Sequence, residues 1–142
     1  MKPSLLEKIA LGLSGLTAFT IGALILFTPH AFYASYGIAL GEDINLLSEL
    51  RAPGTGLAGF GLLILRGIWR QSALPVAMAA ALTVFIAFPT GRLFGVLVDG
   101  VPSGSIMAAL IVELVIATLC LAAFGRRLWH GTPAPFTGSP AR

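Results

Sequence analysis

Four ionisable side chains interrupt apolar stretches of this sequence and are its clearest candidates for chemistry. They are Glu49, Arg51, Arg92 and Glu113. Counted along a helix from the nearest predicted membrane boundary, all four lie about 7–12 Å deep on the same side. A charge at the centre of a bilayer costs about 2.5–3.5 kcal/mol even on the most lenient scale, so such residues pair with one another or mark functional sites. We expect these four to form one cluster.

Two interpretations of this cluster stay open. In the structural one, two carboxylates pair with two guanidiniums and fix the register of the helices, with no required gain in stability. In the functional one, the cluster lines a pocket open to the outer side that binds an anionic headgroup, a quinone-like ring or a proton. Asp99 follows Arg92 by seven residues on nearly the same helix face, and we expect it to be solvated near the boundary.

The composition points to a lipid environment. Hydrophobic residues make up 56% of the 142 positions and charged residues only 11%, with a mean hydropathy of +0.91. Soluble domains carry about 25% charged residues. The net charge of +3 sits at the ends of apolar runs, which argues against nucleic-acid binding. No spacing of residues fits a metal site, a phosphate loop or a nucleophile with its base, so the sequence predicts neither metal nor cofactor.

The apolar runs predict an all-α integral membrane four-helix bundle. A span needs about 20 residues, and four candidates cover residues 9–27, 44–65, 73–98 and 105–124. They form one domain, 1–125, followed by a flexible cytoplasmic tail, 126–142. We read the first run as a retained helix, because it is longer than a secretory signal core and no clear cleavage site follows. Residues 30–43 are predicted to be a connection, and Pro89 with Gly91 predicts a kink or short break in the third span.

The basic residues predict the orientation. Only Arg51 and Arg92 lie on the side that also holds Glu42, Asp43 and Asp99. By the positive-inside rule we expect both termini to face the cytoplasm. The basic residues on the side of the termini are Lys2, Lys8, Arg66, Arg70, Arg126, Arg127 and Arg142.

Small residues predict where the helices touch. Lipid tails are as apolar as leucine, so helices in a membrane associate through close backbone approach at small residues. Two pairs at i,i+3 spacing place glycines on nearly one face: Gly12 with Gly15, and Gly56 with Gly59. We expect these faces to pack within the chain; a dimer interface is the alternative.

Three segments carry a family resemblance: SELRAPGTGLAGFGLLIL, FPTGRLFGVLVDG and IVELVIATLCLAAF. Together they resemble the domain-of-unknown-function 4345 family of small bacterial four-span membrane proteins, over roughly residues 5–124. Ala52-Pro53 departs from the more open helix start of that pattern. The resemblance also implies a neighbourhood of DoxX-like four-helix proteins, some of which associate with oxidoreductases, which is a likeness of fold only. The positions that match the pattern are Glu49, Arg51, Gly91, Arg92, Gly95, Asp99, Gly100 and Glu113.

These observations favour a non-enzymatic membrane protein. It would be an accessory subunit of another membrane protein or a binder of a small amphipathic, lipid-like molecule. The alternative is a small proton-coupled transporter or redox-linked membrane enzyme that uses Glu49 and Glu113 to handle protons. The surroundings of the carboxylates distinguish the two, since a working proton site needs a path for water and spare acceptor capacity.

Overall fold

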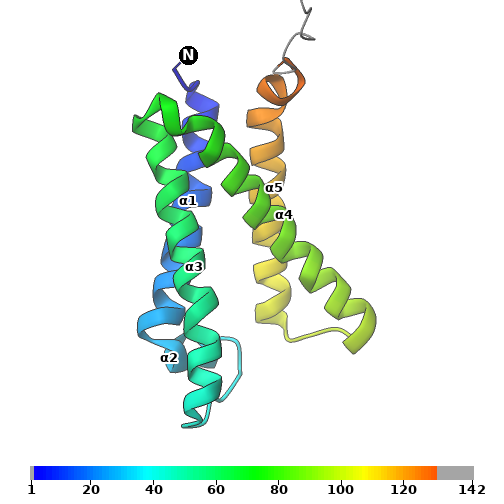
Figure 1. The fold of residues 1–142 in the computed structure, drawn as a ribbon. Coiled ribbons are helices and arrows are strands. Elements are labelled where there is room, and N and C mark those ends of the chain that lie inside the picture. Colours follow the sequence, from blue (N-terminus) through cyan, green and yellow to red (C-terminus); the bar gives the residue numbers. More distant parts are fainter. Residues whose placement is uncertain (1, 131–142) are drawn as a thin grey trace, which may run out of the picture.

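The computed structural model describes residues 2–130, and this part of the chain is helical with no strand. Its helices follow the chain without long loops (Figure 1). They are α1 (Leu5–Phe27), α2 (Pro29–Ala34), α3 (Ile44–Trp69), the short 3-10 helix η1 (Gln71–Ala73), α4 (Leu74–Asp99) and α5 (Gly104–His130).

Side chains in the sequence explain where two of the long helices begin. At α1, the Ser4 hydroxyl accepts a hydrogen bond from the Glu7 amide, and the Glu7 carboxylate accepts one from the Ser4 amide at 2.6 Å. This reciprocal capping box satisfies two of the amides that a helix start leaves unpaired. At α3, the Asp43 carboxylate accepts from the Asn45 amide at 2.8 Å.

Three helices are long and apolar enough to cross a membrane: α1, the η1–α4 stretch Gln71–Asp99, and α5 over Gly104–Arg127. The chain is therefore a helical membrane protein by the length and composition of these segments. The predicted second span corresponds to α3, which is equally long but is not among the three. Its glycines, together with Glu49 and Arg51, make it less apolar than the others.

The structure differs from the predicted elements at three places. Residues 29–34 form the short helix α2, with Pro29 in its first turn, where the missing amide costs nothing. α4 runs unbroken through the buried Pro89, so of the predicted kink or short break the break is absent. α5 continues to His130, beyond the predicted end at residue 124, so residues 126–130 of the expected tail are helical. The rest of that tail, 131–142, lies outside the described residues.

The long helices form two hairpins that are joined at one end. α1 packs along α3, and α4 packs against α5, while α4 inclines away from α3 toward the α4–α5 connection (Figure 1). We call the end where α1 begins and α5 ends the basic end; its charged residues include Lys8, Arg66 and Arg127. We call the opposite end the acidic end; it carries Glu42, Asp43, Glu49 and Asp99.

The core fills the half of the molecule near the basic end. Leu11, Ile64, Ala77, Cys120 and Phe124 are fully buried there, and they come from all four long helices. The interior is thus closed near the basic end, and space between the hairpins remains only toward the acidic end, where they diverge.

Glycines form the contact between α1 and α3. A Cβ at Gly22 would lie 2.5 Å from the Gly54 carbonyl oxygen, and one at Gly15 would lie 3.1 Å from that of Gly61. Each helix thus presents two glycines seven residues apart, and no larger residue fits at this contact.

The predicted packing glycines need correction. Gly15 lies in this contact, but a Cβ at Gly12 would touch only Ile68 Cδ1, at 4.0 Å. A Cβ at Gly56 or Gly59 would meet nothing within 4 Å in the described chain. Their i,i+3 spacing does put them on nearly one face, but that face of α3 points away from α1.

Candidate functional site

Continuous buried stripes on two helices position Arg92 and Glu113. On α4 the buried residues Ala81, Phe85 and Pro89 recur every three or four positions, and Arg92 is the next member of that series. On α5, Glu113 lies between Leu110 and the buried residues Ala117, Cys120 and Phe124 at the same spacing. Residues at this spacing share one helix face, so the two opposite charges face each other across the second hairpin.

The two side chains form an ion pair through a single nitrogen. Arg92 Nε donates to both carboxylate oxygens of Glu113, at 3.1 and 3.0 Å. The Glu113 side chain is 10% exposed and that of Arg92 is 32% exposed. Among residues 2–130, neither Nη1 nor Nη2 of Arg92 donates to a protein acceptor. One edge of the guanidinium is therefore free to bind something else.

Arg92 and Glu113 both line a pocket between the two hairpins. Its volume is about 360 Å³, at the lower end of the range for small-molecule sites. Arg92 and Glu113 are the only charged residues in a lining that is otherwise apolar, aromatic or uncharged. The remaining lining residues are Thr17, Ala18, Ile21, Ile25, Phe32, Tyr33, Tyr36, Ile38, Leu57, Val84, Phe85, Phe88, Ile106, Ala109 and Val112.

Tyr33 on α2 supplies a neutral hydroxyl to this pocket. Burial raises the pKa of the Tyr33 phenol above its usual value of 10, and the nearby positive charge of Arg92 only partly opposes that effect. The phenol is therefore protonated at physiological pH. A protonated phenol can both donate and accept a hydrogen bond.

A second, smaller cavity of about 210 Å³ adjoins the pocket. Arg92 and Ile106 line both spaces, and Asp99 lines only the smaller one, at the acidic end of α4. Asp99 is exposed, and its solvation near the membrane boundary stays a prediction. Arg92 thus borders both the pocket that holds Glu113 and the smaller cavity that holds Asp99.

The other two members of the predicted cluster lie elsewhere. Glu49 is exposed on the first turns of α3 and forms no ion pair within residues 2–130. Arg51 Nη1 instead donates to the Leu26 carbonyl oxygen at 2.6 Å. The last carbonyls of a helix have no partner within it, so Arg51 caps the carboxyl end of α1. The four-member cluster is corrected to one pair.

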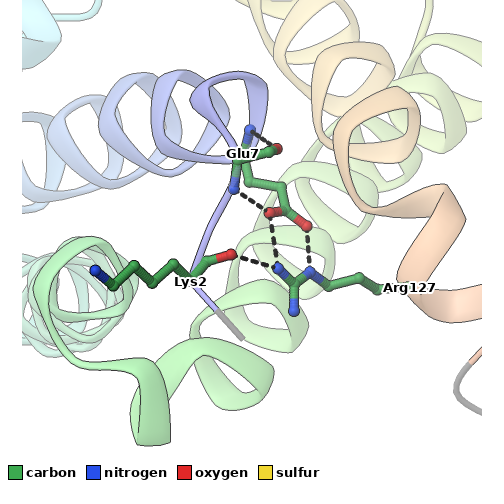
Figure 2. A network of polar contacts seen from close by, with 4 residues as sticks. Lys2, Glu7 and Arg127 are labelled. Carbon is green, nitrogen blue, oxygen red and sulfur yellow. Dashed lines mark hydrogen bonds and ion pairs between the residues drawn. The ribbon is translucent and has the colours of Figure 1, made fainter.

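A second arginine–glutamate pair, which sequence reasoning missed, closes the basic end (Figure 2). Arg127 donates from Nε to Glu7 Oε1 and from Nη2 to Glu7 Oε2, the latter at 3.1 Å, and Nη2 also reaches the Lys2 carbonyl oxygen at 3.0 Å. The Glu7 side chain is 5% exposed. The capping-box spacing of Ser4 and Glu7 was the available signal in the sequence, but nothing there indicated that Glu7 is buried or that Arg127 is its partner.

The described residues contain no group of three side chains that could hold a metal ion. The polar groups that line the pocket are the charged side chains of Arg92 and Glu113 and the hydroxyl-bearing side chains of Thr17, Tyr33 and Tyr36.

A family model described as a domain of unknown function (DUF4345) matches residues 6–124. The chain belongs to the DUF4345 family. The match takes in Glu7, Arg92 and Glu113 but stops before Arg127. No curated protein and no solved structure matches the chain. The family description assigns no activity, so the function of this DUF4345 protein has to be argued from its own geometry.

Proposed function

We propose that this DUF4345 protein binds a small amphipathic, lipid-like molecule in the pocket at its acidic end. The observation that carries the proposal is that Arg92, whose Nη groups have no acceptor among the described residues, lines a mostly apolar pocket of about 360 Å³. Ligand sites characteristically combine an apolar lining with a few placed polar groups, as here. A charged group left partly unpaired in apolar surroundings is costly and marks functional sites in membrane proteins.

The position of the pocket supports a ligand taken up from the membrane. Phe88 and Val112 line it and are themselves exposed on the outside of the protein. α4 and α5, which carry them, are two of the helices apolar enough to lie in lipid. A molecule dissolved in the bilayer would thus meet the pocket between apolar side chains. No described contact joins Glu49 to Glu113, so nothing in the geometry favours the alternative of a proton-handling pair.

We further propose that all four long helices cross the bacterial inner membrane, with both termini in the cytoplasm. α3 is less apolar than the others, but it packs antiparallel against α1 through the contacts of Gly15 with Gly61 and of Gly22 with Gly54. A helix held along a spanning partner in this way crosses with it. The basic residues Lys8, Arg66 and Arg126 then lie on the cytoplasmic side.

Filling the pocket tests the binding proposal. Ala109 lines the pocket, whereas the neighbouring Ala108 is exposed and does not. The probe is a photoactivatable single-chain alkyl ester, added to the protein in lipid nanodiscs. We expect it to label the pocket residues of the wild-type protein and of the control variant Ala108→Trp. The variant Ala109→Trp should lose that labelling. Mass spectrometry of the labelled peptides is the measurement. Equal labelling of both variants would place the ligand elsewhere.

Cysteine accessibility tests the orientation. Ser103 and Ser72 are exposed at the acidic and basic ends, and the native Cys120 is buried. With a membrane-impermeant thiol reagent on spheroplasts, Ser103→Cys should be labelled, and Ser72→Cys only after lysis. The reverse pattern would invert the proposed topology.

A further inference from the structure

We infer that the polar group of the ligand is an uncharged hydrogen-bond acceptor, such as a carbonyl oxygen, bound to the free Nη groups of Arg92. This inference rests on the proposed function, because it names the chemical class that the same pocket takes. Three properties of the site lead to it: the donors that are left over, the charge already present, and the size of the apolar space.

The free charged groups of the site are donors, whereas the hydroxyls of Thr17, Tyr33 and Tyr36 in the lining can donate or accept. Arg92 Nε is occupied by Glu113, whereas Nη1 and Nη2 have no acceptor among residues 2–130. Both oxygens of Glu113 already accept from Arg92 and only a tenth of its side chain is exposed. Arginine has no acceptor of its own. A ligand therefore gains most by presenting an oxygen to the guanidinium edge.

The charge of the site is already balanced. Glu113 neutralises Arg92 inside the pocket, and Asp99 adds a negative charge in the adjoining cavity that Arg92 also lines. An anionic headgroup would thus bring an excess negative charge into apolar surroundings, where an uncompensated charge is expensive. A cationic headgroup would meet the guanidinium itself. A neutral acceptor uses the free donors without either penalty.

The apolar space holds one chain or one ring system. Its volume is about 360 Å³, and Phe32, Phe85 and Phe88 supply flat apolar walls. A phospholipid with two acyl chains is much larger than this. The geometry thus points to a compact, uncharged amphipath that carries a carbonyl or a similar oxygen.

Matched probes test the inference. Four molecules share a dodecyl chain and differ at the head: a methyl ketone, a carboxylate, a trimethylammonium and a plain hydrocarbon. Each competes with the photoactivatable alkyl ester for the full-length protein in zwitterionic nanodiscs. We expect the ketone to compete about tenfold or more better than the other three, since a hydrogen bond to a charged donor is worth at least that factor.

Two variants test whether Arg92 is the group that makes the site prefer the ketone to the hydrocarbon. Arg92→Gln combined with Glu113→Gln removes both charges together, so neither is left unpaired. In this double variant the advantage of the ketone over the hydrocarbon should shrink by about tenfold. Arg70→Gln, an exposed arginine at the other end, should leave the ratio unchanged. The ratio of two probes in one variant does not move if only stability falls.

The failure of the uncharged-ligand inference can be told apart from the failure of the proposed pocket. If the carboxylate or the ammonium competes best, the uncharged class is wrong while the pocket remains the binding site. An unchanged ketone ratio in the double variant would also overturn the role of Arg92. If none of the four competes and Ala109→Trp keeps its labelling, the proposed function fails, and the inference fails with it.

Discussion

At the scale of single residues, the two arginine–glutamate pairs use different nitrogens. Arg127 donates to Glu7 from Nε and Nη2, one nitrogen for each carboxylate oxygen. Its Nη2 also donates to the Lys2 carbonyl oxygen. Arg92 meets both oxygens of Glu113 with Nε alone. A two-nitrogen fork is the arrangement that fixes geometry best. The Glu7–Arg127 pair is thus suited to fixing the position of two helices, whereas the Arg92–Glu113 pair leaves donors free for another molecule.

Removing the charge of Glu113 should destabilise the protein. Glu113→Gln leaves Arg92 in apolar surroundings without its counter-charge, so we expect a loss of about 1.5–3 kcal/mol, the range for a hydrogen bond to a charged group. The measurement is thermal unfolding in detergent. Glu49→Gln is the control, because Glu49 is exposed and forms no described ion pair. Equal melting temperatures for both variants would show that Arg92 does not depend on Glu113.

At the scale of helices, the contact between α1 and α3 predicts that alanine is tolerated at some glycine positions and destabilises the protein at others. Gly22→Ala would place a methyl group 2.5 Å from the Gly54 carbonyl oxygen, so the helices would have to separate. Overpacking of this kind costs about 1–3 kcal/mol. Gly59→Ala meets nothing and replaces a poor helix former, so it should be neutral or stabilising by up to about 1 kcal/mol. Thermal unfolding of the two variants compares them; similar losses would contradict the contact.

Hydropathy was enough to predict three of the long helices but not which face of each helix contacts its neighbour. The predicted spans 9–27, 73–98 and 105–124 fall inside α1, the η1–α4 stretch and α5, respectively. The glycines were harder, because Gly56 and Gly59 look as suitable as Gly54 and Gly61 when only spacing is considered. The actual contact repeats every seven residues on both helices, and only the partner helix reveals which repeat is used.

The charge cluster illustrates the same limit. The helical rise gives the depth of a residue in the membrane but not the direction in which its side chain points. Glu49 and Arg51 are two positions apart and so project to different sides of α3. Arg92 and Glu113 continue series of buried residues that recur every three or four positions, before Arg92 in α4 and on both sides of Glu113 in α5, and this burial appears only in the structure. The capping role of Arg51 depends on where α1 ends, which the sequence shows only approximately.

At the scale of the whole molecule, the basic end holds the two hairpins together. The Glu7–Arg127 pair joins the start of α1 to the end of α5 (Figure 2). Arg127→Gln removes this fork and leaves the buried Glu7 unpaired, so we expect a loss of about 1.5–3 kcal/mol in thermal unfolding. Arg126→Gln removes the same charge from an exposed neighbour and should have little effect. If both variants melt alike, the pair does not hold the hairpins.

The opposite end is joined far more weakly. One hydrogen bond of 3.4 Å, from the Ser103 hydroxyl to the Tyr36 carbonyl oxygen, is the polar contact between the α4–α5 connection and the segment after α2. With the basic end fixed, a rotation of about 5° moves the far end of a 26-residue helix, roughly 39 Å long, by about 3 Å. If the hairpins rotate about the basic end, the space between them widens most beside Ser103, and a bound molecule would leave more readily when that hydrogen bond is open.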